Sequence, residues 1–318
     1  MADALPVVTV LIPTKPDLAD IKAVRAARAL DYPADKLEIL VARGKQPSVQ
    51  RNTGLRAARG ELVYFLDDDS EAQPGNLRRA VEHFRDPKVK MVGGPNLCPP
   101  DAPAVEQVFA LVLSSLAFAS SRARYSSFGK VRESSEKELI LCNMLARRDA
   151  MLELGGFNEA LYPNEENALM DELQKRGGKL IYDPQLIVHR RPRPTLRAFC
   201  KMLMTYGRGR AEQFRETPTM GSALNFVPPI FLTYLVTLPL WFWMAGALAF
   251  VPLGLYALVV LLFTVELVPR GGLLRSLLAS PLIVLTHVLY GFGFWRGLFT
   301  KLKSPGALSN VPVKLEHM

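Results

Sequence analysis

Two long stretches without charged side chains limit how this chain can fold. Residues 217–265 contain no Asp, Glu, Lys or Arg, and a second such stretch covers residues 276–295. A transmembrane helix needs about 20 apolar residues, so the first stretch is long enough for two spans and the second for one. We therefore expect a membrane domain over residues 217–300, with spans at about 225–245, 248–268 and 276–296.

Positive charge gathers directly before the first apolar stretch. The net charge is +9, and residues 190–216 hold eight Arg and Lys against two Glu. The positive-inside rule and anionic lipid headgroups account for such a cluster. A basic stripe can also bind nucleic acid, but this one leads straight into apolar sequence, so no nucleic-acid partner is expected. Apolar residues at helical spacing predict an amphipathic helix over residues 195–216 that lies in the membrane interface.

The N-terminal part alternates short apolar runs with helical patterns. Strands are expected at residues 7–12, 37–41 and 61–66, with helices at 20–30 and 49–59 between them. This order predicts an α/β fold with a mostly parallel, doubly wound sheet. Because no signal peptide precedes the first strand, we expect a cytoplasmic domain over residues 1–194. Residues 301–318 are expected to form a tail.

The third expected strand ends in three carboxylates, Asp67, Asp68 and Asp69. Ligands of open α/β sheets bind beyond the carboxyl ends of the strands. Carboxylates placed there suit Mg²⁺, which commonly bridges them to substrate phosphates. The alternative is a helix N-cap, because Asp or Ser after a strand often begins the next helix.

A second acidic pair, Glu165 and Glu166, is expected to open a later helix. Its members could take a proton from an attacking hydroxyl, or they could simply favour the helix dipole. The two acidic sites and the basic cluster suit transfer of a group that leaves as a phosphate ester. A metal at the aspartates would hold the diphosphate, and the cations would compensate its charge.

Several short segments, taken in order, resemble membrane-anchored family-two glycosyltransferases of the GT-A fold. The segments are VTVLIP (8–13), RNTGLRAARGE (51–61), LDDDS (66–70), VGGP (92–95), LGGFNE (154–159), NEEN (164–167) and VHRR (188–191). The pattern is most similar to bacterial succinoglycan-type members. That similarity rests on RARY (122–125), YGRGR (206–210) and HVLYGFGF (287–294).

The resemblance implies roles for individual residues. Asp67 and Asp69 are implied as the Asp-x-Asp pair that holds Mg²⁺ or Mn²⁺, and His189 as a third metal ligand or else a packing histidine. Glu166 stands at the family's general-base position, with Glu165 as its acidic neighbour. The residues implied to bind the nucleotide-sugar donor are Pro13, Thr14, Arg43, Lys45, Arg51, Asn52, Asp67, Asp68, Arg208 and Arg210. Lipid headgroups are the alternative ligands of Arg208 and Arg210.

One departure from the family pattern concerns the loop after the second strand. Relatives usually carry an acid there that helps to read the nucleotide base, whereas residues 41–48 read VARGKQPS. The acid is absent, and Arg43 and Lys45 are present. Either these cations contact phosphate or the loop is remodelled, and an unusual donor or a loss of catalysis would also explain the change.

The resemblance thus implies an inverting glycosyltransferase of a bacterial inner membrane, multi-pass, with its catalytic domain in the cytoplasm. It would move a sugar from a nucleotide-sugar to a lipid-linked (polyprenyl-diphosphate) sugar acceptor in polysaccharide or glycan assembly. The alternatives are a polyprenyl-phosphate glycosyltransferase and a non-catalytic membrane scaffold with the same fold. A full third span would place Lys301 and Lys303 outside, against the positive-inside rule, so a re-entrant third segment stays open. The sequence sets no oligomeric state.

Overall fold

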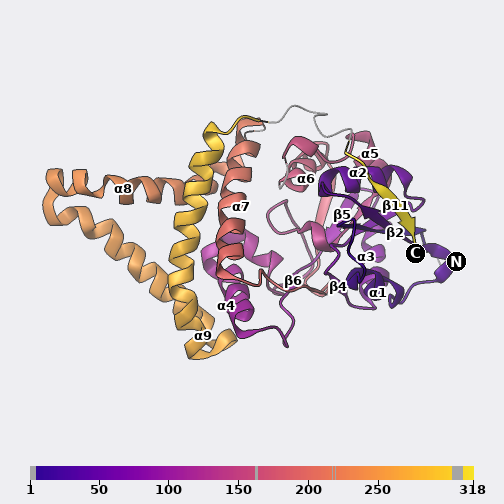
Figure 1. Ribbon diagram of the computed structural model, residues 1–318, viewed down its shortest axis with the longest axis horizontal. Helices are drawn as coiled ribbons and strands as arrows, with labels where there is room; N and C mark the ends of the chain where they lie inside the picture. Colours follow the sequence, from indigo (N-terminus) through magenta and orange to yellow (C-terminus); the bar gives the residue numbers. More distant parts are fainter. Residues whose placement is uncertain (1–4, 162–163, 217, 219, 303–310) are drawn as a thin grey trace. The chain divides into compact units, whose positions relative to one another are not determined.

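The computed structural model describes residues 5–161, 164–216, 218, 220–302 and 311–318 (Figure 1). The chain forms two compact units. The first unit contains Met1–Pro99, Ala123–Arg191 and Lys303–Met318, and the second contains Pro100–Arg122 and Pro192–Leu302. The units therefore do not follow the chain linearly. Of the expected tail, residues 303–310 lie outside the described residues, whereas 311–318 belong with the first unit.

The first unit is built on a mixed eight-stranded sheet with the order β11-β2-β1-β3-β8-β5-β9-β7. β1 is parallel to β2 and to β3, whereas β8 runs antiparallel between β3 and β5. The predicted α/β fold is thus confirmed, with antiparallel strands that the sequence pattern did not indicate. The strands are β1 (Val8–Thr14), β2 (Leu37–Arg43), β3 (Leu62–Phe65), β5 (Val89–Gly93), β7 (Arg132–Glu133), β8 (Met144–Arg147), β9 (Lys179–Tyr182) and β11 (Lys314–His317).

A second, three-stranded sheet lies in the same unit. Its order is β4-β10-β6, with β4 (Glu71–Ala72), β10 (Val188–His189) and β6 (Asn96–Leu97). β4 follows the three aspartates within two residues, and it pairs antiparallel with β10. This pairing brings the segment around His189 beside the segment that follows β3.

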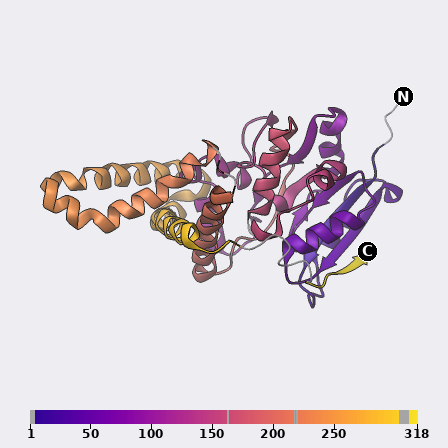
Figure 2. The ribbon, with the colours of Figure 1, turned by 90° about the horizontal axis from the view of Figure 1, so that it is seen from above.

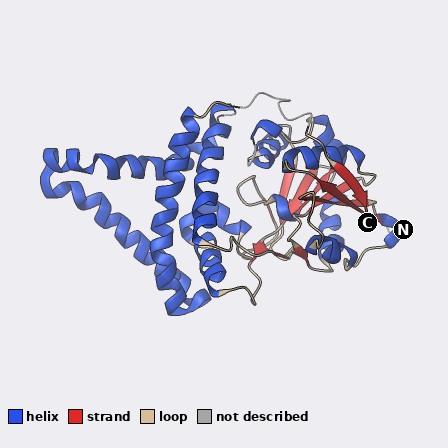
Figure 3. Cartoon of the chain, in the orientation of Figure 1, coloured by secondary structure: helices blue, strands red, loops and turns tan. Residues whose placement is uncertain are grey.

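Helices cover both faces of the large sheet (Figures 2 and 3). Residues of α1 (Lys22–Arg28) and α3 (Asn76–Glu82) pack in one apolar cluster. Residues of α2 (Pro47–Ala57), α5 (Arg148–Glu153) and α6 (Glu165–Lys175) pack in the other. Along β1, Val10 and Ile12 belong to the first cluster and Leu11 to the second. Because successive side chains of a strand point to opposite faces, burial on both sides requires the continuous apolar run of β1.

The second unit is helical. It contains α4 (Ala104–Leu113), α7 (Leu196–Glu216), α8 (Val227–Ala245) and α9 (Val251–Phe299). Gly272 has φ 75° and interrupts α9, so two helical parts, 251–271 and 273–299, follow one another. The break falls between the second and third expected spans. Short 3-10 segments complete the chain at Ala34–Lys36, His83–Arg85, Leu116–Arg124, Leu141–Asn143, Glu159–Leu161, Met220–Phe226 and Gly246–Phe250.

By length and composition, one continuous stretch among the described residues, Ala223–Phe299, is apolar enough to cross a membrane. α8 and the first part of α9 form a helical hairpin within it (Figure 1). The number of spans stays a prediction.

Glycines bring α7 and the last part of α9 into close contact. A Cβ atom on Gly207 would lie 2.1 Å from the carbonyl oxygen of Tyr290, and one on Gly293 would lie 2.1 Å from that of Met204. Small residues let helix backbones approach in this way. The two segments YGRGR and HVLYGFGF therefore pack against each other. α7 also buries Phe199 in a stacked pair with Phe109 of α4, at 4.4 Å between ring centroids.

Candidate active site

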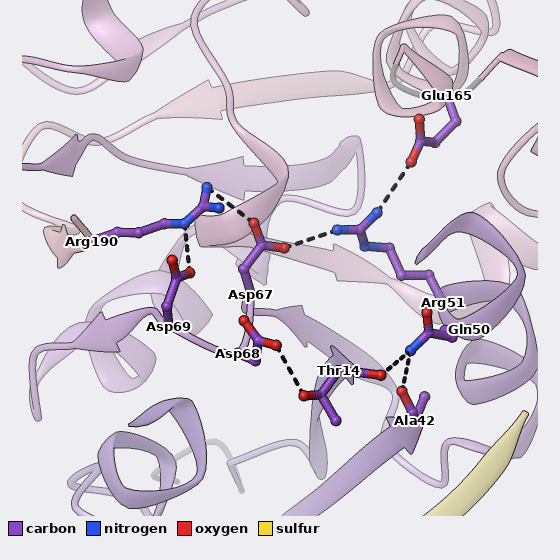
Figure 4. Close-up of polar contacts among 9 residues, drawn as sticks. All are labelled: Thr14, Ala42, Gln50, Arg51, Asp67, Asp68, Asp69, Glu165 and Arg190. Atoms are coloured by element: carbon purple, nitrogen blue, oxygen red, sulfur yellow. Dashed lines mark hydrogen bonds and ion pairs between the residues drawn. The ribbon is translucent and has the colours of Figure 1, made fainter. Parts of the chain in front are cut away.

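Two of the three aspartates after β3 are paired with arginines (Figure 4). Asp67 accepts from Arg51 Nη2 at 2.9 Å, and its other oxygen lies 3.1 Å from Arg190 Nη1. Asp69 accepts from Arg190 Nε at 2.6 Å. Two arginines thus lie against three neighbouring carboxyl groups. Arg190 was part of the VHRR segment, but the sequence did not identify it as a site residue.

The third aspartate, Asp68, faces the end of β1. Its Oδ2 accepts the hydroxyl of Thr14 at 2.9 Å, so the predicted contact residue Thr14 does lie at the site. Burial raises the pKa of Asp68, the Thr14 hydrogen bond opposes this, and the charges of Asp69 and Asp67 raise it further. The N-cap alternative is not realised, because the next helix, α3, has Gly75 at its N-cap.

Arg51 joins the aspartates to the second acidic pair. Its Nη1 lies 3.1 Å from Glu165 Oε1, while its Nη2 holds Asp67. The structure therefore brings the two predicted acidic sites together through one side chain. Glu165 is 1% exposed. Burial, aided by the charge of Glu166 and opposed by Arg51, raises the pKa of Glu165 to about 7.

Glu166 stands in a different environment from its neighbour. Both residues lie in the first turn of α6, where acids also favour the helix dipole. Glu166 is half-buried, and it makes no hydrogen bond or ion pair with any residue that the structure describes. Glu165 is thus paired with Arg51, whereas the general-base role of Glu166 stays a prediction.

The ends of β1 and β2 are tied together by Gln50, which sequence reasoning missed. Its amide donates to the carbonyl oxygen of Thr14 at 2.7 Å and also to that of Ala42. Gln50 is 2% exposed, so these backbone carbonyls are satisfied without water. Pro13, another predicted contact, is buried in β1 opposite Ala42. A polar residue on the buried face of α2 was the available signal.

The predicted contact residue Arg43 is committed to the protein itself. Its Nε donates to Glu316 Oε2 at 2.7 Å, and its Nη1 donates to the carbonyl of Leu18 at 2.9 Å. Arg43 thus braces the loop after β1 and contacts β11. Lys45, by contrast, is exposed at the end of β2.

Asn52 has a structural role in α2. Its amide group donates to the carbonyl of Phe157 at 2.8 Å and to Glu159 at 2.9 Å, and its oxygen accepts from the backbone of Phe157 at 2.8 Å. It therefore holds the turn of Gly155 and Gly156, which has positive φ at both glycines. The predicted donor contact of Asn52 stays a prediction.

His189 does not form a three-residue metal-binding group with the aspartates. Among the residues that the structure describes, no group of three His, Cys, Asp or Glu side chains is arranged to hold a metal. The next residue, Arg190, follows the end of β10 and pairs with Asp67 and Asp69. The donor set still fits a hard cation, since the Asp69 side chain is 44% exposed and carboxylate oxygens are the ligands such ions prefer. Asp67 and Asp69 would hold such an ion.

Arg208 and Arg210 belong to the second unit. Arg208 Nε lies 3.3 Å from Glu212 Oε1, and Arg210 Nη1 donates to Gln213 Oε1 at 3.2 Å, both within α7. Their predicted contacts with a diphosphate or with lipid headgroups stay predictions.

A sheet of this kind, with helices on both faces and acids after a central strand, is the arrangement of GT-A glycosyltransferases. The profile of glycosyl transferase family group 2 matches residues 62–296. The chain therefore belongs to that family, as its segments had suggested.

The chain is also similar in sequence to two curated glycan-biosynthesis proteins of bacteria. Pre-mycofactocin glycosyltransferase of Mycobacterium tuberculosis is 29% identical over 170 residues, covering 51% of this chain and 34% of that protein. Succinoglycan biosynthesis protein ExoA of Rhizobium meliloti is 27% identical over 158 residues, covering 48% of this chain and 46% of that protein. The chain thus spans less than half the length of either relative.

A solved structure has a similar fold. Mannosyltransferase PcManGT from Pyrobaculum calidifontis, in complex with GDP-Man and Mn²⁺, matches with a TM-score of 0.59 and 18% identity. The match covers 88% of this chain and 87% of that one. At this identity the likeness concerns the fold alone.

Proposed function

We propose that this chain is an inverting glycosyltransferase that moves a sugar from a nucleotide-sugar to a hydroxyl of a lipid-linked acceptor. The observation that carries the proposal is the bridge formed by Arg51. It joins Asp67, on the side where a diphosphate would bind, to the acidic pair that would meet the acceptor. This link between the two acidic sites is what supports a site that serves both a donor and an acceptor.

In the proposed reaction Glu166 accepts the proton of the acceptor hydroxyl. The hydroxyl oxygen forms a bond to the anomeric carbon while the bond from that carbon to the diphosphate oxygen breaks, so the configuration inverts. Glu165, held by Arg51, keeps the first turn of α6 in place beside the aspartates. Mg²⁺ or Mn²⁺, bound by Asp67 and Asp69, would supply positive charge to the departing diphosphate. Arg190 adds a fixed cation at the same carboxylates.

The lipid-linked acceptor and the membrane location are supported by the apolar helices. Large apolar side chains of α8 and its turn stand exposed, with Trp243 at 83%, Leu248 at 73% and Val236 at 72%. Such a surface suits hydrocarbon rather than water. We place the chain in a bacterial inner membrane and assign it to polysaccharide or glycan assembly, in line with the name of its Rhizobium relative.

The test uses the full chain in lipid nanodiscs with Mn²⁺, a panel of nucleotide-sugars and a bacterial lipid extract. GDP-mannose comes first, because the Pyrobaculum mannosyltransferase holds it. We expect sugar to enter the lipid fraction. Glu166→Gln should reduce the rate by about 10²–10⁴-fold without weakening nucleotide binding. Glu172→Gln, on the exposed side of the same helix, is the matched control.

Two results would change the assignment. If no nucleotide-sugar is consumed and neither GDP nor UDP binds with Mn²⁺, the chain is a scaffold with the fold and no donor site. If Glu166→Gln is mild, the acceptor is a lipid phosphate, because a phosphate nucleophile needs no base.

A further inference from the structure

A cavity of about 740 Å³ opens beyond the ends of β1 and β2 in the first unit. Its walls come from three separate parts of the chain, namely the loop after β1 (residues 16–19), the end of β2 (residues 43–45) and the β11 segment (residues 311–314 and 316). The last of these wall segments is far from the other two in sequence. Ligands of open α/β sheets bind at this edge.

The β11 segment is held in place by the sheet. β11 pairs antiparallel with β2, so that Lys314 faces Arg43 and Leu315 faces Ala42. Val313 and Leu315 pack against the apolar cluster beneath the sheet. The carbonyl oxygen of Pro312 would lie 3.4 Å from a Cβ atom on Gly44, so the segment passes close over the end of β2. This wall of the cavity is therefore an ordered part of the fold.

The same strand supplies an acid where the loop after β2 has none. Glu316 lies at the cavity and accepts from Arg43 at 2.7 Å. Hydrogen bonds from Lys314 and Arg43 lower the pKa of Glu316, which keeps its carboxylate charged. A carboxylate can accept hydrogen bonds from the N–H groups of a nucleobase. The predicted phosphate contact of Arg43, which is paired in this way, stays a prediction.

The cavity and the aspartates share one strand end. Thr14 gives its hydroxyl to Asp68, and its carbonyl oxygen accepts the backbone N–H of Gly44 at 3.0 Å. A ligand with a diphosphate at the aspartates and a planar base in the cavity would therefore run along the end of β1. The apolar side chains of Leu18, Val311 and Val313 suit the faces of such a base.

We propose that the β11 segment completes the pocket for the base of the nucleoside diphosphate donor, with Glu316 replacing the acid missing after β2. The inference rests on the proposed function, since it assigns the base to a donor at the aspartates. The proposed role can be told apart from a purely structural role of β11. If β11 forms the base pocket, substitutions of its cavity-lining residues must weaken binding of the base without weakening binding of the phosphates.

Calorimetry on the full chain tests this with three probes, each with Mn²⁺, namely GDP, UDP and inorganic pyrophosphate. Val311→Trp fills the cavity and should weaken binding of both nucleotides about tenfold or more, equivalent to about 1.4 kcal/mol. Pyrophosphate binding should stay within about twofold of wild type. Glu316→Gln should change the ratio of GDP to UDP affinity. His317→Ala, on the same strand but outside the cavity, should change neither the nucleotide affinities nor their ratio.

The outcomes separate the two proposals. If wild type binds nucleotides and Val311→Trp and Glu316→Gln bind all three probes as wild type does, the base-pocket inference fails and the proposed function stands. A loss of pyrophosphate binding equal to the loss of nucleotide binding would also overturn it, since that indicates general damage. If wild type binds neither nucleotide with Mn²⁺, the proposed function fails and the inference falls with it. Melting curves of each variant confirm that it is folded.

Discussion

Replacing Arg51 with methionine tests whether this side chain holds the two acidic sites together. Arg51 is 6% exposed, and it pairs with Glu165 at 3.1 Å and with Asp67 at 2.9 Å. In Arg51→Met, Asp67 keeps its second partner, Arg190. Glu165 loses its only ion pair among the described residues and stays in the interior. The cost should therefore depend on whether Glu165 is ionised.

The pH dependence follows from the raised pKa of Glu165. A carboxyl group whose pKa is about 7 in the fold and 4.5 in the unfolded chain binds more protons when folded between those pH values. Its contribution to stability is therefore fully present below pH 4.5 and is lost as the pH rises through about 7. Without Arg51 the folded pKa rises further, so the loss continues above pH 7. Each additional pH unit then costs up to about 1.4 kcal/mol.

These values give a measurable difference. At pH 6, where Glu165 is largely protonated, we expect Arg51→Met to cost about 1 kcal/mol, as for an ordinary lost hydrogen bond. At pH 8.5 the cost should reach about 3 kcal/mol, the lower end of the range for breaking a buried ion pair. The difference of about 2 kcal/mol corresponds to roughly 4–8 °C in Tm for a unit of this size.

Thermal unfolding at pH 6 and pH 8.5, followed by intrinsic fluorescence, measures the effect. Adding Glu165→Gln to Arg51→Met should remove the pH dependence of the Tm loss. Arg56→Met, an exposed substitution on the same helix, is the control and should show no pH-dependent loss of Tm. The reasoning is refuted if Arg51→Met lowers Tm equally at both pH values, or if the second substitution leaves the pH dependence intact.

Three further substitutions test other parts of the structure. Gly207→Ala should lower Tm by several degrees, because a backbone carbonyl of α9 would lie 2.1 Å from the new methyl group. Gly254→Ala, where a methyl group would enter open space, is the control, and equal melting curves for the two variants would refute close packing of α7 and α9. Asp69→Asn should remove the Mn²⁺ dependence of GDP binding in calorimetry, and retention of that dependence would exclude Asp69 as a ligand. Burial opposes ionisation of Asp183, but hydrogen bonds, including one from His83, lower its pKa to about 2. Asp183 therefore adds stability that is fully present well above pH 3.8 and is lost as the pH falls through about 2. In urea unfolding, Asp183→Asn should cost about 1.5–3 kcal/mol at pH 7 and roughly half as much at pH 3, and equal losses at the two pH values would contradict the assignment.

The sequence predicted those parts of the fold that long periodic patterns encode. The apolar run of β1 and the helical spacing of α7 each specify an element by burial, which is a property of neighbouring residues. The direction of β8 is not encoded in this way, because an antiparallel strand buried on both faces has the same composition as a parallel one. β11 was missed for a related reason, since the alternation of Lys314, Leu315, Glu316 and His317 is too short and polar to stand out.

The sequence predicted which residue types form the candidate site, but not which side chains pair with one another there. The positions of Asp67 and Glu165 followed from patterns along the chain, whereas the position of the arginine that joins them is set by the packing of α2 against β1, β2 and α5. Arg190, which directly follows β10, pairs with the aspartates, and a strand of two residues is too short to give a pattern that predicts this. The pairing of Arg43 with Glu316 joins residues 273 positions apart, beyond the reach of any local rule.

The distance in sequence between β2 and β11 also determines when the sheet can be completed during synthesis. β2 is an edge strand until β11 reaches it, and its unpaired N–H and C=O groups are a template for strands of other chains. At about 5–20 residues per second, the 273 residues from Arg43 to Glu316 take a ribosome roughly 14–55 s. All the apolar helices emerge within that interval. The edge of β2 therefore stays open until the last strand of the sheet has been made, and throughout that interval it can pair with strands of other chains.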